Sequence, residues 1–148
     1  MSADFRDVLA ALVQADARFL VVGAHALAAH GVPRVTGDLD LLVEPTADNA
    51  HKVWQALVTF GAPLDSLGIR EGDFVTPEVV TQLGLPPYRI DILTTISGVS
   101  FDEAWRGRLE SEMLGVPVAF LGRTEFIRNK RASGRRKDLD DIEALEGS

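Results

Sequence analysis

The stretch Gly37-Asp-Leu-Asp-Leu-Leu-Val43 places two carboxylates two residues apart at the start of an apolar run. Side chains at positions i and i+2 of a β-strand point to the same face, so Asp38 and Asp40 are expected to stand side by side, with Cα atoms about 6–7 Å apart. Two ionised carboxylates at that separation repel each other, and partial burial strengthens the repulsion. Because a divalent cation between them would remove it, the pattern is typical of a magnesium site.

A third carboxylate, Asp91, lies in the apolar segment Tyr88-Arg-Ile-Asp-Ile-Leu93, although aspartate is depleted in strands. Each acid also has a plainer interpretation. Asp38 could end a Gly-Asp turn, Asp40 could be a solvated strand position, and Asp91 could pair with Arg89 on the same face. Taken together, two acids on one strand and a third on a neighbouring strand can hold one or two Mg²⁺ ions that also bind phosphate oxygens.

The periodicity of apolar residues predicts one domain over residues 1–148 that alternates helices and strands. The predicted strands are 18–22, 38–43 and 88–96, and residues 113–121 are predicted to form a strand or a hairpin around Gly115. The predicted helices are 4–15, 24–30, 46–60, 100–109, 124–134 and 138–145, with a short helical turn in 76–83. This order indicates an α/β (α+β) fold with a small mixed β-sheet flanked by helices.

The charge of the chain is uneven. The net charge is −7, but residues 123–137 hold seven of the 15 basic residues. They are Arg123, Arg128, Lys130, Arg131, Arg135, Arg136 and Lys137. A solvated helix face is the plainer explanation of such a run, and a local anion site is the functional one. The acidic remainder argues against general nucleic-acid binding, and no sequence-specific DNA binding is expected.

The chain has no cysteine, which excludes disulfides and thiolate metal sites. The N-terminal residues lack the apolar region of a signal peptide, and no apolar run reaches the roughly 20 residues that a transmembrane helix needs. A cytoplasmic location without membrane attachment is therefore expected.

The strand predicted at 18–22 runs directly into a helix at Gly23-Ala24. A glycine at such a junction lets backbone come close to a ligand and points free N–H groups at an anion. The junction is common in α/β proteins, and alone it is a weak indication of phosphate binding.

Gly23-Ala24, the Asp38-Leu-Asp40 motif and Asp91 on a later strand together resemble the nucleotidyltransferase superfamily that includes polymerase β. The chain resembles more closely the small bacterial nucleotidyltransferases of abortive-infection and toxin–antitoxin (AbiE-like) systems. The matching residues are Gly31, Arg34, Thr36, Asp38, Asp40, the tail 129–138 and Asp141. The resemblance spans nearly the whole chain and implies a nucleotidyltransferase fold.

The resemblance implies that Asp38, Asp40 and Asp91 ligate magnesium at a two-ion site, which Mn²⁺ could also fill. It implies that Asp91 is the base for the acceptor hydroxyl, and that Gly23 and Ala24 meet the nucleoside triphosphate. Ala24 departs from the pattern, because many members have a serine there whose hydroxyl can donate to a phosphate.

Further nucleotide contacts are expected from basic residues. Lys130, Arg135 and Lys137 are predicted to contact the triphosphate, whereas Arg131 and Arg136 are expected to face solvent or an acceptor. Arg34, with Thr36 close by, could grip a phosphate or neutralise the carboxylates. Asp138 and Asp141 are explained by the favourable position of acids in the first turn of a helix.

The expected activity is Mg²⁺-dependent transfer of a nucleoside monophosphate from an NTP such as ATP to a hydroxyl acceptor, with release of pyrophosphate. The acceptor could be a toxin-like partner protein, the 3′ end of an RNA such as tRNA, or a small molecule. The alternative is a catalytically weak or inactive member of the same fold that acts as an antitoxin or regulatory module by sequestering a partner protein.

Overall fold

The computed structural model describes residues 3–34, 36–84 and 88–147, and within these ranges it contains one six-stranded sheet. The helices are α1 (Ala3–Gln14), α2 (Gly23–Ala29), α3 (Ala47–Phe60), α4 (Phe101–Arg106), α5 (Arg123–Ser133) and α6 (Arg136–Glu146), with a 3₁₀ turn η1 (Glu71–Phe74). The strands are β1 (Phe19–Val22), β2 (Asp38–Val43), β3 (Val80–Leu83), β4 (Arg89–Leu93), β5 (Leu109–Met113) and β6 (Val116–Phe120).

The sheet is mixed, with the strand order β3-β4-β2-β1-β6-β5. The central strand β1 runs antiparallel to β2 and parallel to β6, while β2 runs parallel to β4. The antiparallel pairs β3–β4 and β5–β6 form the two edges of the sheet. The mixed sheet with flanking helices confirms the predicted fold class.

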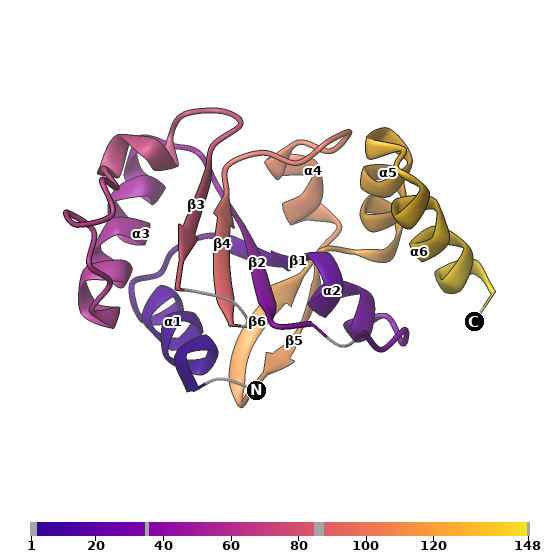
Figure 1. Cartoon of the computed structure of the whole chain (residues 1–148), viewed down its shortest axis with the longest axis horizontal. Helices are drawn as coiled ribbons and strands as arrows, with labels where there is room; N and C mark the ends of the chain where they lie inside the picture. Colours follow the sequence, from indigo (N-terminus) through magenta and orange to yellow (C-terminus); the bar gives the residue numbers. More distant parts are fainter. Residues whose placement is uncertain (1–2, 35, 85–87, 148) are drawn as a thin grey trace.

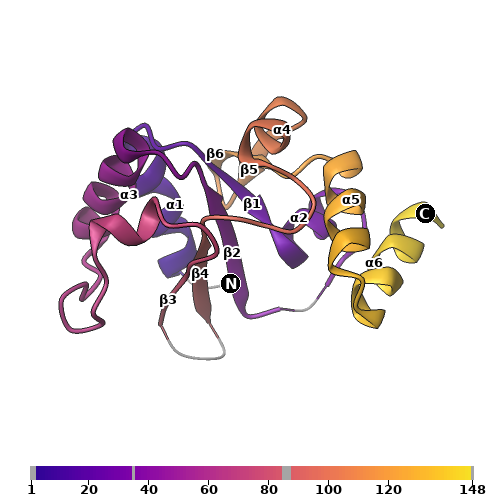
Figure 2. The ribbon, with the colours of Figure 1, turned by 90° about the horizontal axis from the view of Figure 1, so that it is seen from above.

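Helices cover the sheet in two groups (Figures 1 and 2). Helices α1 and α3 pack together at one side, and the α5–α6 hairpin stands at the other side near α2. Helix α1 buries Phe5, Val8, Leu9 and Leu12, the helical spacing that predicted it. The buried apolar cluster draws most heavily on β1, β2, α1 and α3, and it extends to Leu27 of α2 and Phe126 of α5.

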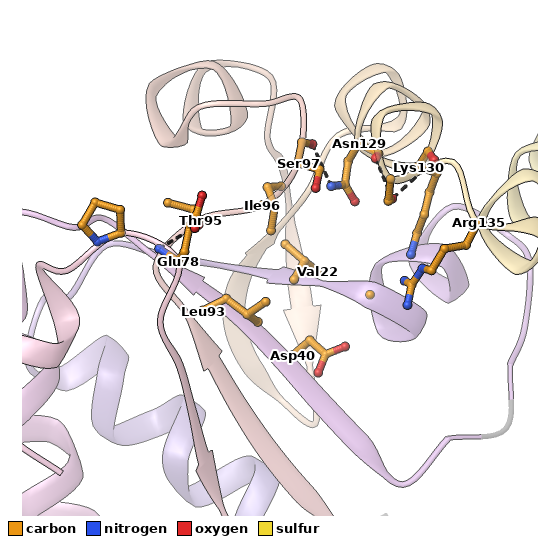
Figure 3. Close-up of a pocket in the computed structure, with 13 residues that line it drawn as sticks. Val22, Asp40, Glu78, Leu93, Thr95, Ile96, Ser97, Asn129, Lys130 and Arg135 are labelled. Carbon is orange, nitrogen blue, oxygen red and sulfur yellow. Dashed lines mark hydrogen bonds between the residues drawn. The ribbon is translucent and has the colours of Figure 1, made fainter.

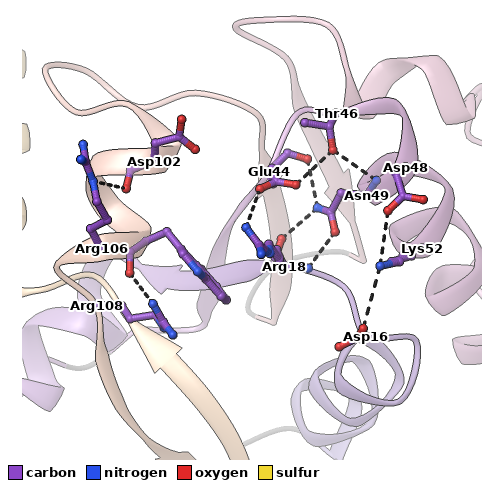
Figure 4. A network of polar contacts seen from close by, with 11 residues as sticks. Asp16, Arg18, Glu44, Thr46, Asp48, Asn49, Lys52, Asp102, Arg106 and Arg108 are labelled. Carbon is purple, nitrogen blue, oxygen red and sulfur yellow. Dashed lines mark hydrogen bonds and ion pairs between the residues drawn. The ribbon is translucent and has the colours of Figure 1, made fainter.

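A buried asparagine ties α3 to the sheet (Figure 4). Asn49 is 3% exposed, and its side chain accepts from the Arg18 backbone N–H at 2.7 Å. It also donates to the carbonyl oxygens of Arg18 and Glu44 at 2.9 and 3.0 Å. Because every polar atom of this amide is paired, the contact fixes the start of β1 and the end of β2 against the N-terminus of α3.

Three boundaries predicted from the sequence are wrong. Residues 80–83, expected in a helical turn, form strand β3, where side chains alternate between exposed and buried. The helix expected to reach residue 109 ends at Arg106, and Leu109 instead opens strand β5. The strand expected over 88–96 is shorter and ends at Leu93. None of the helices in the described ranges is long and apolar enough to cross a membrane.

Candidate active site

The pairing of β2 with β4 gathers four charged side chains on one face of the sheet. The register opposes Asp38 to Arg89 and Asp40 to Asp91. Since residues two apart on a strand share a face, the three acids and the arginine form a compact square. Asp91 is largely covered, with 12% of its side chain exposed, and Asp38 is 40% exposed.

Arg89 bridges two of the three acids. Its Nε donates to Asp91 Oδ1 at 2.9 Å, and its Nη2 donates to Asp91 Oδ2 at 3.2 Å. The same Nη2 donates to Asp38 Oδ2 at 3.3 Å. The hydrogen bond to Asp91 and the charge of that carboxylate raise the pKa of Arg89 above its usual value. The guanidinium therefore neutralises one side of the square.

Asp40 occupies the other side of the square without such a partner. No cationic side chain within the described residues forms an ion pair with it. Burial, followed by the negative charges of Asp91 and Asp38, raises the pKa of Asp40 to about 6, although Lys130 and Arg89 act in the opposite direction. The negative charge of Asp40 is thus unfavourable where it lies, and a cation bound nearby would offset it.

Gly23 is required by the position of Asp40. Its φ of +67° lies in the left-handed region, and a Cβ added there would collide with Asp40 Oδ2. The sequence argument assigned this glycine to a close approach of ligand. The structure places the Asp40 carboxylate against it, at the point where β1 ends and α2 begins.

A cavity of about 510 Å³ opens on one side of Asp40 (Figure 3). Its floor is apolar, with Val22, Leu93 and Ile96, and its polar rim includes Asn129, whose amide donates to the Ser97 carbonyl at 2.9 Å. We call it the first cavity. Its lining residues are Val22, Gly23, Asp40, Pro77, Glu78, Leu93, Thr95, Ile96, Ser97, Asn129, Lys130, Ser133 and Arg135.

A second cavity of about 500 Å³ lies on the other side of Asp40 and is more highly charged. Its lining residues are Gly23, Ala24, Leu27, Arg34, Thr36, Asp38, Asp40, Lys130, Arg135, Lys137, Asp140 and Asp141. The two cavities share Gly23, Asp40, Lys130 and Arg135. Asp40 and the two cations therefore stand at the boundary between two spaces.

Lys130 and Arg135 are held at that boundary by a buried acid. Asp138 has no exposed surface, accepts from Arg135 Nε at 2.8 Å and Nη2 at 3.2 Å, and lies 3.4 Å from Lys130 Nζ. Burial alone would raise the pKa of Asp138, but the hydrogen bond from Arg135 and the charges of Lys130 and Arg135 outweigh it and lower that pKa to about 2. The explanation of Asp138 by helix polarity is therefore incomplete.

Arg34 lines the second cavity and also has a partner that the sequence analysis did not name. Its guanidinium pairs with Asp141 of α6 at 2.5 Å and so links the segment before β2 to the C-terminal hairpin. Thr36 accepts from the Asp38 backbone N–H at 3.1 Å, which shapes the entry into β2. Lys137 lines the second cavity.

The structure thus brings together all ten candidate residues around the start of β2 and the α5–α6 hairpin. The pair of Arg89 with Asp91, which the sequence offered as the plainer interpretation of Asp91, is present. Sequence reasoning missed the further contact of Arg89 with Asp38 and the partnerships of Asp138 and Asp141. The i, i+3 spacing of Arg135 and Asp138 was the available signal for one of these contacts. Within the described residues, no three acidic or histidine side chains are arranged to hold a metal ion together.

Comparisons with known proteins give a likeness of fold. No protein-family model matches the chain, and no curated protein sequence matches it. The fold is similar to the crystal structure of a "putative nucleotidyltransferase" from Thermotoga maritima, with a TM-score of 0.59 and 14% identity. The match covers 97% of this chain and 88% of the other. At that identity the likeness establishes a shared nucleotidyltransferase fold.

Proposed function

We propose that this chain is a metal-dependent nucleotidyltransferase that moves a nucleoside monophosphate from an NTP to a hydroxyl acceptor and releases pyrophosphate. The observation that carries the proposal is the meeting of Asp38, Asp40 and Asp91 on one face of β2 and β4, beside cavities that share Lys130 and Arg135. The shared nucleotidyltransferase fold supports the same reading.

The chemistry of the three acids suits a hard divalent cation, since carboxylate oxygens are the ligands that Mg²⁺ prefers and Mn²⁺ accepts. Asp40, which has no ion pair with any described side chain, would be the first ligand, and Asp38 and Asp91 would complete the set. Once bound, one or two such ions would stabilise the negative charge that develops on the transferring phosphoryl group and on the leaving oxygen.

Side chains of the protein would neutralise the phosphates and accept the proton of the acceptor. Lys130 and Arg135, fixed by Asp138, would neutralise the triphosphate and the departing pyrophosphate. Asp91 would take the proton of the acceptor hydroxyl, being largely buried next to Asp40. The second cavity, which four cationic side chains line together with four carboxylates, suits the phosphates and their metal ions. The first cavity, with its apolar floor, suits a nucleoside or an acceptor group.

We propose the acceptor as a chemical class, a macromolecule that carries a free hydroxyl. Both cavities border the C-terminal hairpin, and a macromolecule that brings its own surface suits this small domain better than an enclosed small molecule. We propose a partner protein or the 3′ end of an RNA such as tRNA, with ATP among the donors to test, and a cytoplasmic, toxin–antitoxin setting as in the AbiE-like proteins.

The test is label transfer from each α-labelled NTP, with Mg²⁺ or Mn²⁺, to protein and RNA acceptors. We expect transfer by the unmodified protein and at least a hundredfold loss in Asp38→Asn and Asp40→Asn. Asp65→Asn, which changes an exposed carboxylate outside both cavities, is the matched control. Transfer that persists unchanged in the two site variants would remove the proposed mechanism.

A second candidate function is favoured by two observations at the same site. Ala24 supplies no hydroxyl for a phosphate, and Arg89 occupies oxygens of Asp38 and Asp91. An inactive fold that sequesters a partner protein would have both features. Neutralisation of a partner that is equally effective after Asp40→Asn would favour this function over catalysis.

A further inference from the structure

We propose that Arg89 is a gate for the cation: it holds the place of the metal in the resting site and must leave before a divalent ion can be bound by Asp38 and Asp91 together. The inference rests on the proposed function, because it concerns how that site is loaded. It makes Arg89 a positioning residue, acting through the carboxylates and touching neither nucleotide nor acceptor.

The Arg89 guanidinium already occupies the carboxylate oxygens that a metal ion would need. Both oxygens of Asp91 accept hydrogen bonds from the guanidinium, at 2.9 and 3.2 Å, and Asp38 Oδ2 accepts a third at 3.3 Å. A magnesium ion needs its carboxylate oxygens at about 2.0–2.1 Å in an octahedral arrangement. The ion and the guanidinium would therefore compete for the same lone pairs.

The positive charge of the guanidinium also opposes binding of a metal ion between Asp38 and Asp91. A dication bound between Asp38 and Asp91 would lie within a few ångströms of a guanidinium that stays protonated at all accessible pH values. The two cations repel each other, so binding of one weakens binding of the other.

The contacts of Arg89 also cover both oxygens of Asp91. A carboxylate whose two oxygens both accept from a bidentate arginine is poorly placed to receive a proton from an acceptor hydroxyl. Release of Arg89 would free Asp91 for ligation and for base function in one movement. A single contact would thus keep the site inactive until a cation arrives.

The position of Arg89 in β4 indicates how the gate would open. Only 30% of the Arg89 side chain is exposed while it bridges the acids, yet the arginine lies at the first position of β4. Its side chain extends from the end of a strand, so it can swing outward without disturbing the ladder between β2 and β4. The Asp40 side of the square, free of arginine contacts, would be the point at which the ion first binds.

The test is Mn²⁺ binding, measured by electron paramagnetic resonance of the free ion, without nucleotide and without any activity readout. We expect Arg89→Ala and Arg89→Gln to bind Mn²⁺ about tenfold or more tightly than the unmodified protein, because a neighbouring like charge is removed. Arg106→Ala removes the same charge from α4, outside both cavities, and is expected to leave the affinity unchanged. Asp40→Asn in either background should abolish the binding.

Unchanged or weaker Mn²⁺ binding in both Arg89 variants would overturn the gate, because the arginine would then be organising the acids rather than blocking them. The proposed function would survive that result as long as the unmodified protein binds the ion through Asp40. Absence of Mn²⁺ binding in every protein would instead overturn both proposals.

A measurement on the unmodified protein covers the case in which the Arg89 variants fail to fold. The Nε–H resonance of Arg89, assigned in the unmodified protein through its scalar connection to the Arg89 backbone amide, should shift on titration with Mg²⁺ and saturate with the same dissociation constant as ion binding. A resonance that stays fixed while the ion binds would overturn the gate.

Discussion

Because the ionised form of Asp40 is unfavourable in the native state, the free energy of unfolding should depend on pH. Its native pKa of about 6 lies above the unfolded value near 3.8, so the native state binds more protons than the unfolded state between these two values. Stability should therefore fall as pH rises from about 4 to 6 and level off above. At pH 8 we expect Asp40→Asn to raise the free energy of unfolding by roughly 1–2 kcal/mol, after allowance for solvent screening.

This gain should shrink at pH 4.5, where Asp40 is protonated in the native protein. Urea unfolding at the two pH values measures it, and Asp65→Asn corrects for the general loss of a negative charge. A gain of equal size at both pH values would contradict the raised pKa.

At Gly23 the backbone and the site depend on each other. Gly23→Ala should cost roughly 1–2 kcal/mol for the left-handed backbone and should also push the Asp40 carboxylate out of place. Gly61→Ala is a well-matched control, since Gly61 has a φ of +92° with open space around its Cα. We expect similar losses of stability in thermal unfolding, but a loss of Mn²⁺ binding only in Gly23→Ala. Equal ion binding in both variants would show that Asp40 tolerates the added methyl group.

The helices α5 and α6 depend on one acid between them. Asp138→Asn removes a fully buried charge from between Lys130 and Arg135, so we expect a loss of about 2–4 kcal/mol at pH 7. Since the native pKa of about 2 lies below the unfolded 3.8, this stabilisation is complete above about pH 4 and is lost as pH falls toward 2. Urea unfolding between pH 3 and 8 checks both statements. Asp140→Asn, an exposed acid of the same helix, should change little.

Among the helices and strands, those with a strong local pattern were predicted well and those with a weak pattern were predicted poorly. Strands β1 and β2 and helices α1 and α3 have long apolar periods or clear caps, such as Thr46 at the start of α3 and Gly61 at its end. Strand β3 has two polar residues among its four, Thr81 and Gln82, and follows Thr76-Pro77, which favours a turn. Its strand character comes from pairing with β4, a contact that the local sequence does not encode.

Across the whole molecule, the contacts that the sequence did not predict join residues that lie far apart along the chain. The spacing of Asp38 and Asp40 and the isolated Asp91 predicted which acids would meet, because strand periodicity is local and neighbouring strands share a face. The pair of Arg34 and Asp141 is separated by 107 residues, and no periodicity relates them. Such a contact follows from the path of the α5–α6 hairpin across the second cavity, which only the tertiary structure gives.

That path also predicts how the molecule should respond to nucleotide. If the triphosphate lies between Asp40 and the cations of α5 and α6, then α,β-methylene-ATP with Mg²⁺ should slow amide hydrogen exchange in residues 123–146 and 36–43. Helices α1 and α3 lie at the other side of the sheet, and their exchange should stay within a factor of about two. Asp40→Asn should remove the protection. Protection concentrated in α1 and α3 would place the nucleotide elsewhere, because ligand binding slows exchange mainly in the segments whose opening it opposes.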